Sequence, residues 1–387
     1  MMKNLRPVRG ICIATTLLVL LAAKAHGQTV TPGKVLFDAT KAQMAGNADW
    51  VVDADVNNVG TTAGGVMTPG AGSESNPQRF PTPPQSGITA STPENYWKGA
   101  LSAWGVGLVK LGFSVETLPI GGRITFGDAT NAQDLSNYGI YVIPEPNILF
   151  TLAEKQAIIR FVEAGGGLFM VGNHSGSDRN NDGFDPPEVY NDLFNNNGIA
   201  VNPFGIQVNP VSFSVIAAFR SNDAAADPIL AGPVGTVSAI EYNSGASMTV
   251  SGAGQGALFR TATRSNSDVM FAFSTYGKGR VAMVGDSSPP DDGTGDTGDN
   301  LFNGWFAEVG GDHGDAILNA CIWMNPSPSA PPCPADLDGS GSVDGADLAT
   351  MLQSWGACKS CVSDIDGNGS VDGADLATLL QSWGACP

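Results

Sequence analysis

The chain has 387 residues and a formal net charge of −18, with 19 Lys and Arg residues against 37 Asp and Glu residues. This balance argues against a nucleic-acid partner, because contacts to phosphates need cationic side chains. The length allows two or more domains, and a hydrophobic content of 42% is enough for a buried core.

Residues 1–27 read as a secretory signal peptide. Cationic residues precede the apolar run Ile11–Ala23, and the small residues of AKAHGQ follow it. We expect cleavage after Gly27, with cleavage after Ala25 as the alternative. The apolar run is shorter than the ~20 residues that a membrane-spanning helix needs, and no later segment is long and apolar enough. The sequence therefore predicts a secreted protein, extracellular or at the cell surface, without a membrane span after cleavage.

Residues 28–324 alternate short apolar runs with helical stretches. The apolar runs predict strands at 34–38, 112–118, 139–144, 166–172 and 279–286. Helices are expected at 93–111, 151–164, 300–309 and 315–324, and the second has Thr151 and Glu154 in capping-box spacing. Residues 54–92 predict a long loop, and residues 211–273 predict additional strands and loops. This alternation indicates an α/β domain with a parallel, flavodoxin-like sheet flanked by helices.

Polar residues follow four of the predicted strands, namely Asp38, Glu145, Asn173 with His174, and Asp286. Parallel sheets bind ligands at the carboxyl ends of their strands. A histidine there is a candidate general base or metal ligand. We therefore take His174, Asp38 and Asp286 as the candidate catalytic or metal-holding set. The alternative is that the aspartates cap helices and that His174 holds a loop.

A calcium-like spacing follows His174 in DRNNDG (178–183). Asp178, Asn180 and Asp182 stand at positions 1, 3 and 5 of such a loop, and Asp185 or Glu188 could complete a third calcium site. An Asn- and Asp-rich loop without an ion is the alternative. The later DDGTGDTGDN (291–300) predicts a solvated loop that caps the next helix.

Three segments of the large domain resemble the class I glutamine amidotransferase-like fold, in particular its ThuA-like branch. They are FVEAGGGLFMVGNHSG (161–176), DPILAGPV (227–234) and YGKGRVAMVGDSS (276–288). The nucleophilic cysteine of that family is missing, since no cysteine lies between the signal peptide and Cys321. Cys321, within AILNACIWM, reads as a small buried hydrophobic residue. Glutamine hydrolysis through a thiolate is therefore excluded, and no G-x-S-x-G motif supports a serine esterase.

The linker NPSPSAPP (325–332) precedes two copies of one unit in residues 333–387. Each copy contains a twelve-residue loop with oxygen-bearing side chains at positions 1, 3, 5, 7, 9 and 12 and glycine at position 6. This spacing places oxygens around a calcium ion, so we expect two calcium sites. The expected ligands are Asp336, Asp338, Ser340, Ser342, Asp344 and Asp347 in the first loop and Asp364, Asp366, Asn368, Ser370, Asp372 and Asp375 in the second.

A helix with one apolar face is expected after each loop. Its apolar positions follow the i, i+3, i+4, i+7 pattern: Leu348, Met351, Leu352 and Trp355 in the first copy, and Leu376, Leu379, Leu380 and Trp383 in the second. We expect the two faces to bury each other, and Val343 and Val371 to bridge the two loops by main-chain bonds. A flexible acidic tail, the alternative, predicts neither the stripe nor the repeat.

The paired loop-helix units resemble a cysteine-framed dockerin, the calcium-binding module that attaches bacterial extracellular enzymes to cohesin domains. The resemblance covers residues 333–386 and implies a small all-α module and a cohesin-like or cell-surface docking protein as partner. One departure is that Gly345–Ala346 and Gly373–Ala374 stand where dockerins often carry partner-contacting hydroxyls.

The four cysteines of this region predict disulfides in an exported protein. Cys358 and Cys361 are close in sequence, so the first helix ends beside the second repeat. If a two-fold axis relates the repeats, Cys386 lies near Cys333. Our hypothesis is Cys333–Cys386 with Cys358–Cys361; pairing within each repeat is the rival.

Two functions are compatible with these patterns. The first is an exported hydrolase-like domain that is anchored by the calcium-dependent module and acts near polysaccharide, as proteins with dockerins usually do. The second is a non-catalytic carbohydrate-binding or scaffold protein on a degenerate amidotransferase-like fold.

Overall fold

The computed structural model describes residues 31, 33–53, 60–61, 67–68, 85–217, 219–295, 301–307, 312–326, 333–338, 340–357, 361–366 and 368–386. The expected signal peptide lies outside these residues, as do most of the expected linker and most of the expected loop 54–92. Within the described ranges, no helix combines the length and apolar character needed to cross a membrane.

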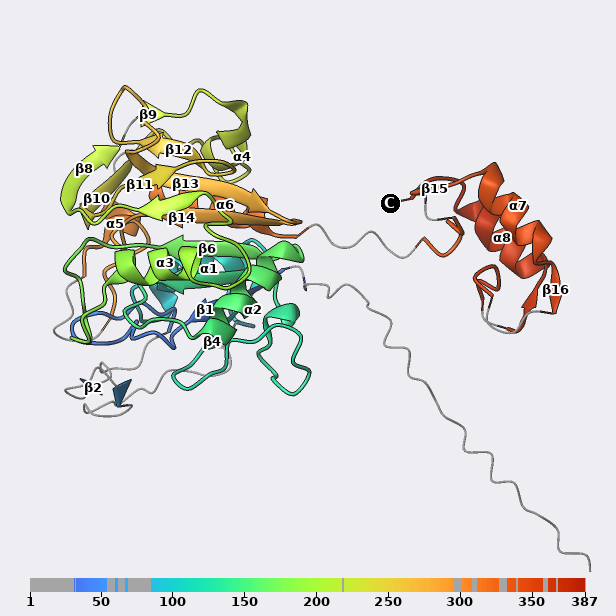
Figure 1. The fold of residues 1–387 in the computed structure, drawn as a ribbon, viewed down its shortest axis with the longest axis horizontal. Coiled ribbons are helices and arrows are strands. Elements are labelled where there is room, and N and C mark those ends of the chain that lie inside the picture. The colour runs from blue at the N-terminus through green and yellow to red at the C-terminus, as the bar shows by residue number, and fades with distance from the viewer. Residues whose placement is uncertain are drawn as a thin grey trace, which may run out of the picture.

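A mostly parallel sheet forms the centre of the α/β domain (Figure 1). The parallel neighbours follow the order β4 (Ser114–Leu118), β1 (Lys34–Asp38), β5 (Ile140–Pro144), β6 (Gly167–Val171) and β14 (Gly279–Val284). These are the five predicted strands, with small differences at their ends. Most of their side chains are buried, which explains why the inner strands are largely apolar, whereas the edge strand β4 alternates as SVETL.

Beyond β14 the sheet continues with antiparallel strands, so the prediction of a parallel sheet holds only for the side from β4 to β14. β13 (Val269–Tyr276) pairs antiparallel with β14 because the two strands are joined by Gly277 and Lys278 alone. Gly277 has a φ of 58°, as tight hairpin turns require. The other strands are β7 (Ile206–Val208), β9 (Phe219–Arg220), β11 (Met248–Val250) and β12 (Gln255–Phe259), with a separate ribbon of β8 (Phe213–Ala217) and β10 (Ile240–Gly245) and another of β2 (Gly60–Thr61) and β3 (Met67–Thr68).

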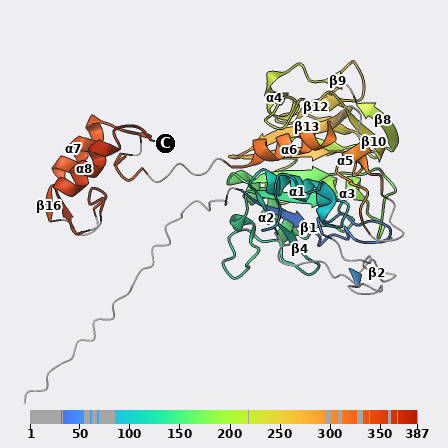
Figure 2. The same cartoon turned by 180° about the vertical axis from the view of Figure 1, so that it is seen from behind.

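Helices cover both faces of the sheet. α1 (Ser102–Lys110) and α6 (His313–Met324) lie side by side on one face (Figure 2), together with the short α4 (Asp227–Leu230) and α5 (Gly304–Ala307). α2 (Leu152–Glu163) and α3 (Pro186–Asn195) cover the other face. Successive side chains of β1 enter the two cores in turn, with Val35 and Phe37 on the α1 side and Leu36 on the α2 side.

The helix boundaries agree with the sequence at some points and differ at others. α2 begins with the predicted capping box, in which Thr151 N donates to Glu154 Oε2 (2.7 Å) and Glu154 N donates to Thr151 Oγ1 (3.3 Å). α1 starts at Ser102 rather than at residue 93, because residues 94–96 form a separate 3₁₀ turn. Further 3₁₀ turns lie at Leu135–Asn137 and Ala224–Ala226, and α3 was not predicted.

The end of α6 lies at the amino ends of the central strands. Asn325 Oδ1 accepts a hydrogen bond from Gly33 N, which precedes β1 (2.9 Å). Met324 lies against Gly167 at the start of β6, and Asn325 and Pro326 lie against Gly139, just before β5. These first two residues of the expected linker therefore belong to the α/β domain.

Residues 333–386, the C-terminal module, contain two helices that lie side by side, α7 (Gly345–Gln353) and α8 (Gly373–Gln381) (Figure 1). The prediction that this module is all-α is wrong, because each loop also contributes a short strand. β15 (Ser342–Val343) pairs with β18 (Gly384–Ala385), and β17 (Ser370–Val371) pairs with β16 (Gly356–Ala357). The valines at position 8 thus bridge each loop to the segment after the other unit's helix, and not the two loops to each other.

The core of the C-terminal module is small. Met351 and Leu379 are fully buried, but the predicted mutual burial of the whole stripe is wrong, since half of the apolar stripe positions stay about half exposed: Leu352, Trp355, Leu380 and Trp383. Two nine-residue helices enclose too little interior for these side chains. A disulfide joins Cys333 to Cys386, which confirms that part of the hypothesis. Cys361 is also disulfide-bonded, while Cys358 lies outside the described residues.

The indole of Trp104 offers a test of the core on the α1 side. It is fully buried, with its ring centroid 5.2 Å from that of Phe37 and 4.7 Å from that of Phe169. Trp104→Ala should lower the free energy of unfolding by about 3–5 kcal/mol, because it removes a large buried ring and leaves a cavity. Chemical denaturation followed by circular dichroism measures this loss. Leu111→Ala, at an exposed position just after α1, should change it by less than about 0.5 kcal/mol; equal effects of the two variants would contradict this packing.

Candidate functional site

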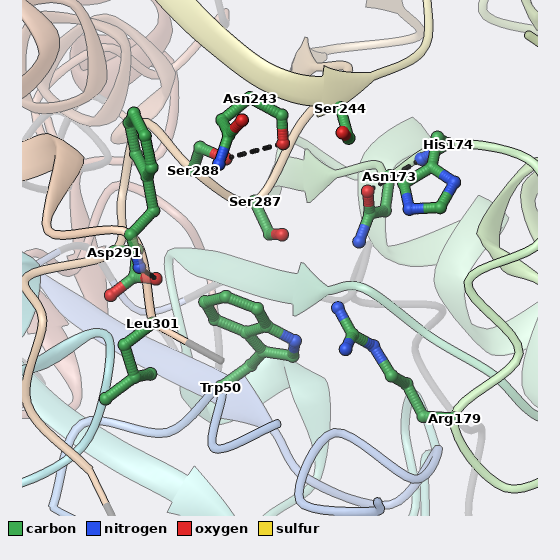
Figure 3. Close-up of a pocket in the computed structure, with 11 residues that line it drawn as sticks. Trp50, Asn173, His174, Arg179, Asn243, Ser244, Ser287, Ser288, Asp291 and Leu301 are labelled. Carbon is green, nitrogen blue, oxygen red and sulfur yellow. Dashed lines mark hydrogen bonds between the residues drawn. The ribbon is translucent and has the colours of Figure 1, made fainter. Parts of the chain in front are cut away.

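A cavity of about 130 Å³, the sheet-end cavity, opens beyond the carboxyl ends of β6 and β14. This is the edge at which parallel sheets bind ligands. Its lining comes from the loops after β1, β6 and β14 and from β10 itself (Figure 3). The lining residues are Trp50, Asn173, His174, Arg179, Asn243, Ser244, Ser287, Ser288, Asp291, Leu301 and Phe302.

Asn173 and His174 follow β6 and have fixed orientations. Asn173 Oδ1 accepts a hydrogen bond from His174 N (2.7 Å), so its Nδ2 faces the other way as a donor. His174 Nδ1 lies 2.8 Å from the carbonyl oxygen of Ser175. A carbonyl only accepts, so this contact places a proton on Nδ1 and, in the neutral ring, leaves Nε2 as the acceptor. His174 could therefore take up a proton through Nε2.

The two aspartates of the candidate catalytic set do not line the sheet-end cavity. Asp38 is fully buried, and its two oxygens accept hydrogen bonds from Thr40 Oγ1 (2.8 Å) and Gln43 Nε2 (2.9 Å). Asp286 is also buried, and its Oδ2 accepts a hydrogen bond from Asn243 N (2.6 Å). Both carboxylates thus hold the loops at their strand ends, and neither caps a described helix as the alternative interpretation predicted. Of the three candidates, His174 alone lines the cavity.

A buried ion pair that the sequence analysis missed connects the cavity to β5. Glu145 is fully buried just after β5 and has a φ of 37°, a left-handed conformation that non-glycine residues rarely adopt. Arg179 Nε lies 2.8 Å from Glu145 Oε1, and Arg179 Nη1 donates to Asn47 Oδ1 (2.6 Å). Arg179 is the cation in DRNNDG and is the residue in the sequence that could indicate an ion pair. The Asp and Asn spacing of the same segment instead favours the interpretation as a calcium loop.

Two further lining residues could not be found from the sequence pattern. Trp50 lies in the loop after β1 and is 3% exposed, and its Nε1 has no hydrogen-bond partner. Ser287 follows Asp286 and is 4% exposed. Figure 3 shows the indole of Trp50 and the guanidinium of Arg179 facing Ser287 and Asn173 across the cavity. The cavity is therefore rich in hydrogen-bond donors.

The first two residues of the expected solvated loop 291–300 are not solvated, and residues 296–300 lie outside the described part of the chain. Asp291 and Asp292 are both buried: Asp291 Oδ2 accepts from Phe302 N (2.6 Å), and Asp292 Oδ2 accepts from Ala103 N in the first turn of α1 (2.7 Å). Burial raises the pKa of Asp291 to about 6 and the pKa values of Asp286 and Asp292 to about 7. Part of this region thus carries protonated carboxyls near neutral pH.

The expected third calcium site is not assembled. Asp178 accepts from Gly183 N (2.8 Å) and Asp182 N (3.2 Å), as a position-1 residue does in the C-terminal module, but Asp185 instead accepts from Gly176 N, outside this loop. Throughout the described part of the chain, only two groups of three carboxylates lie within 4.8 Å of one another, and neither group includes these residues.

The two groups occupy positions 1, 3 and 12 of the predicted calcium loops. They are Asp336, Asp338 and Asp347 in the first loop and Asp364, Asp366 and Asp375 in the second. The structure therefore confirms that each loop could bind a metal ion, and an all-oxygen set is the kind that calcium prefers. The hydroxyl of Ser340 at position 5 lies 3.1 Å from the carbonyl oxygen of Ser342 at position 7, so further oxygens are near the first group.

The position-12 carboxylates are held in the ionised form. Asp347 is fully buried and accepts backbone hydrogen bonds from Asp344 N (2.8 Å), Asp338 N (3.1 Å) and Leu337 N (2.7 Å). These bonds, led by that from Asp344, keep its pKa below the ordinary value, and the equivalent bonds do the same for Asp375. In the second loop Asp364 Oδ1 is buried without a partner, which a bound cation would supply. The residues therefore fit a divalent cation.

The position-9 residues have a different role from that of the acidic groups. Asp344 Oδ1 accepts from Ala346 N and Asp372 Oδ1 accepts from Ala374 N, each at 2.8 Å, so both side chains cap the helices that follow. Position 9 of such loops often reaches calcium through water. Three of the six expected ligand side chains in each loop are therefore brought together directly.

Cys321 lies in α6, where it is fully buried and has no disulfide partner. Burial raises the pKa of its thiol to about 12. A thiol in this state is not a nucleophile at neutral pH. The position and protonation state of Cys321 thus agree with the exclusion of thiolate chemistry.

No family model matches the chain, and no curated protein matches it. Solved structures are similar to part of it. The mmIFT52 N-terminal domain has a TM-score of 0.39 and 13% identity, over 57% of this chain and 88% of that chain. Cytoplasmic Protein STM3548 from Salmonella typhimurium has a TM-score of 0.36 and 14% identity, over 57% and 85%. The β-galactosidase from Rahnella sp. R3 has a TM-score of 0.35 and 12% identity, over 59% of this chain and 29% of that chain.

The buried carboxyls near the cavity predict how the stability of the α/β domain depends on pH. The pKa values of Asp286, Asp291 and Asp292 lie above the value of about 3.9 expected in the unfolded chain, so between pH 4 and 7 the folded state binds more protons. Their contribution to stability is present at low pH and is lost as the pH rises through 6–7. The melting temperature of the domain in excess calcium should be several degrees higher at pH 5 than at pH 8, as measured by calorimetry. A melting temperature that is equal or rises towards pH 8 would contradict this prediction.

Proposed function

We propose that the C-terminal module is a calcium-dependent docking module of a secreted protein and that it attaches the α/β domain to a cohesin-like or cell-surface partner. The observation that carries this proposal is the pair of equivalent acidic groups, each with a buried, ionised position-12 carboxylate. Three carboxylates within 4.8 Å repel one another in the absence of a cation. Calcium binding would therefore supply folding free energy that two nine-residue helices lack.

The exposed apolar side chains of the module support a docking role. Leu352 and Trp355 on the first unit and Leu380 and Trp383 on the second are about half exposed at equivalent positions. Tryptophan is enriched among the residues that dominate protein–protein binding. The module would thus present two similar apolar surfaces to a partner.

For the α/β domain we propose a hydrolase that acts on polysaccharide at the sheet-end cavity, with His174 as the proton acceptor. His174 lines the cavity with Nε2 as an acceptor in the neutral ring, and Asp291, whose pKa is near 6, lines it as well. The second candidate is carbohydrate binding without catalysis. It is favoured by the separation of Asp38 and Asp286 from the cavity lining.

Metal analysis tests the docking module. The purified full-length chain, equilibrated with calcium and then desalted, should contain two calcium ions by mass spectrometry. Asp336→Ala and Asp364→Ala should each leave one ion and the double variant none, because each removes a position-1 ligand. Asp178→Ala is the matched control outside the module and should retain two ions. Chelation should increase the hydrogen-exchange rates of residues 345–353 and 373–381. Wild-type protein that contains no calcium after the desalting step would overturn the proposal.

Substitution of His174 tests the proposed hydrolase. If a polysaccharide panel reveals turnover, His174→Ala should lower kcat by at least about a hundredfold, because it removes the proton acceptor. Asp178→Asn, in the same segment but outside the cavity lining, should retain wild-type turnover. Full activity of His174→Ala would remove this residue from the mechanism. Glycan binding without any turnover would establish the second candidate instead.

A further inference from the structure

Three of the side chains that line the sheet-end cavity, those of Trp50, Asn173 and Arg179, carry N–H donors. Trp50 Nε1 is an indole N–H that can only donate, and it is buried without a partner. Asn173 Nδ2 is a donor because the amide oxygen already accepts from His174 N. The guanidinium of Arg179 adds N–H groups at the same wall (Figure 3). A buried N–H without an acceptor costs about 1–3 kcal/mol, so the indole N–H of Trp50 favours a ligand that supplies an acceptor oxygen.

The geometry at this wall suits an acceptor group, and Arg179, whose charge Glu145 partly offsets, is the cation beside it. The Trp50 indole and the Arg179 guanidinium lie next to each other, and Asn173 and the Ser287 hydroxyl face them across the cavity (Figure 3). Glu145 holds Arg179 in place through Nε, behind the lining. Asp291 is the acidic lining residue, and Phe302 N and Gly293 N already donate to its two oxygens. Acceptor oxygens placed between Trp50, Arg179 and Asn173 would meet donors on several sides.

The size of the cavity limits the ligand that can enter. About 130 Å³ is close to the ~150 Å³ of a cavity that holds one benzene ring. That space is suitable for one small charged group and the start of the ring that carries it, and not for a whole oligosaccharide. A carboxylate presents two oxygens in one plane, which can accept from donors on opposite sides.

We propose that the sheet-end cavity binds the carboxylate of an acidic sugar, so that the polysaccharide recognised by the α/β domain contains uronic acid residues. This inference rests on the proposed function for the polysaccharide and names its class. Trp50, Asn173, Arg179 and Ser287 are the binding residues. Trp50 Nε1 is assigned the most direct role, because a bound carboxylate would satisfy a donor that otherwise has no partner.

The test is a calorimetric titration of the full-length protein in calcium with galacturonate, its methyl ester, galactose and galactose 6-sulfate. Galacturonate should bind at least about tenfold more tightly than the methyl ester and galactose, which lack the charge, and more tightly than the sulfate. Equal binding of galacturonate and galactose would overturn the inference and leave carbohydrate binding intact. Preference for the sulfate would also overturn it. Failure of every sugar and every polysaccharide on the panel would overturn both the inference and the proposed glycan function.

Variants of the lining residues test whether galacturonate binds in the sheet-end cavity. Trp50→Phe keeps a buried ring and removes the N–H, and it should weaken galacturonate binding about tenfold, because a hydrogen bond to a charged group is lost. Ser287→Ala provides a second, smaller change at the opposite wall and should also weaken binding. Trp97→Phe is the matched control, since Trp97 is likewise 3% exposed with an unpartnered Nε1 but does not line the cavity. Unchanged binding in both Trp50→Phe and Ser287→Ala, with wild-type melting temperatures, would contradict the assignment.

Discussion

Burial of both faces of the central sheet is the constraint on which the α/β domain depends. Helices cover each face, so the strands themselves carry apolar side chains on both sides. Polar groups then have to gather where the strands end, and Asp38, Glu145, Asn173 and Asp286 stand there one after another. Most of these groups are used to hold the loops that follow. Because those loops are fixed in place, the hydrogen-bond donors that they do not use themselves face the sheet-end cavity.

The chain places carboxylates in two opposite environments. In the C-terminal module, backbone N–H groups surround Asp347 and Asp375 and keep them charged. Near the sheet-end cavity, burial dominates, so Asp286, Asp291 and Asp292 retain their protons to higher pH. The same residue type therefore supports a cation site in one region and neutral loop anchors in the other. The number of main-chain donors and the extent of burial decide between the two outcomes.

The sequence was sufficient for the features that depend on local pattern. The five central strands were predicted from apolar runs, α2 from the Thr151 and Glu154 capping box, and the acidic groups of the module from loop spacing. Features that depend on contacts between distant segments were missed. Nothing in the pattern pairs Arg179 with Glu145 or turns Trp50 towards the carboxyl ends of the strands. α3 was missed because its acidic N-terminal segment was assigned to a calcium loop, although Pro186–Pro187 after Asp185 is typical of a helix start.

The hydrogen bond between Asn325 and Gly33 fixes where the chain emerges from the α/β domain. That point is at the amino ends of the strands, whereas the sheet-end cavity opens beyond their carboxyl ends. Any force applied to the chain at Pro326 would therefore act on the end of the domain where the end of α6 and the residues after it contact the starts of β1, β5 and β6. If the C-terminal module docks as proposed, the cavity mouth would lie at the end of the α/β domain opposite this point and would stay accessible to a long polymer.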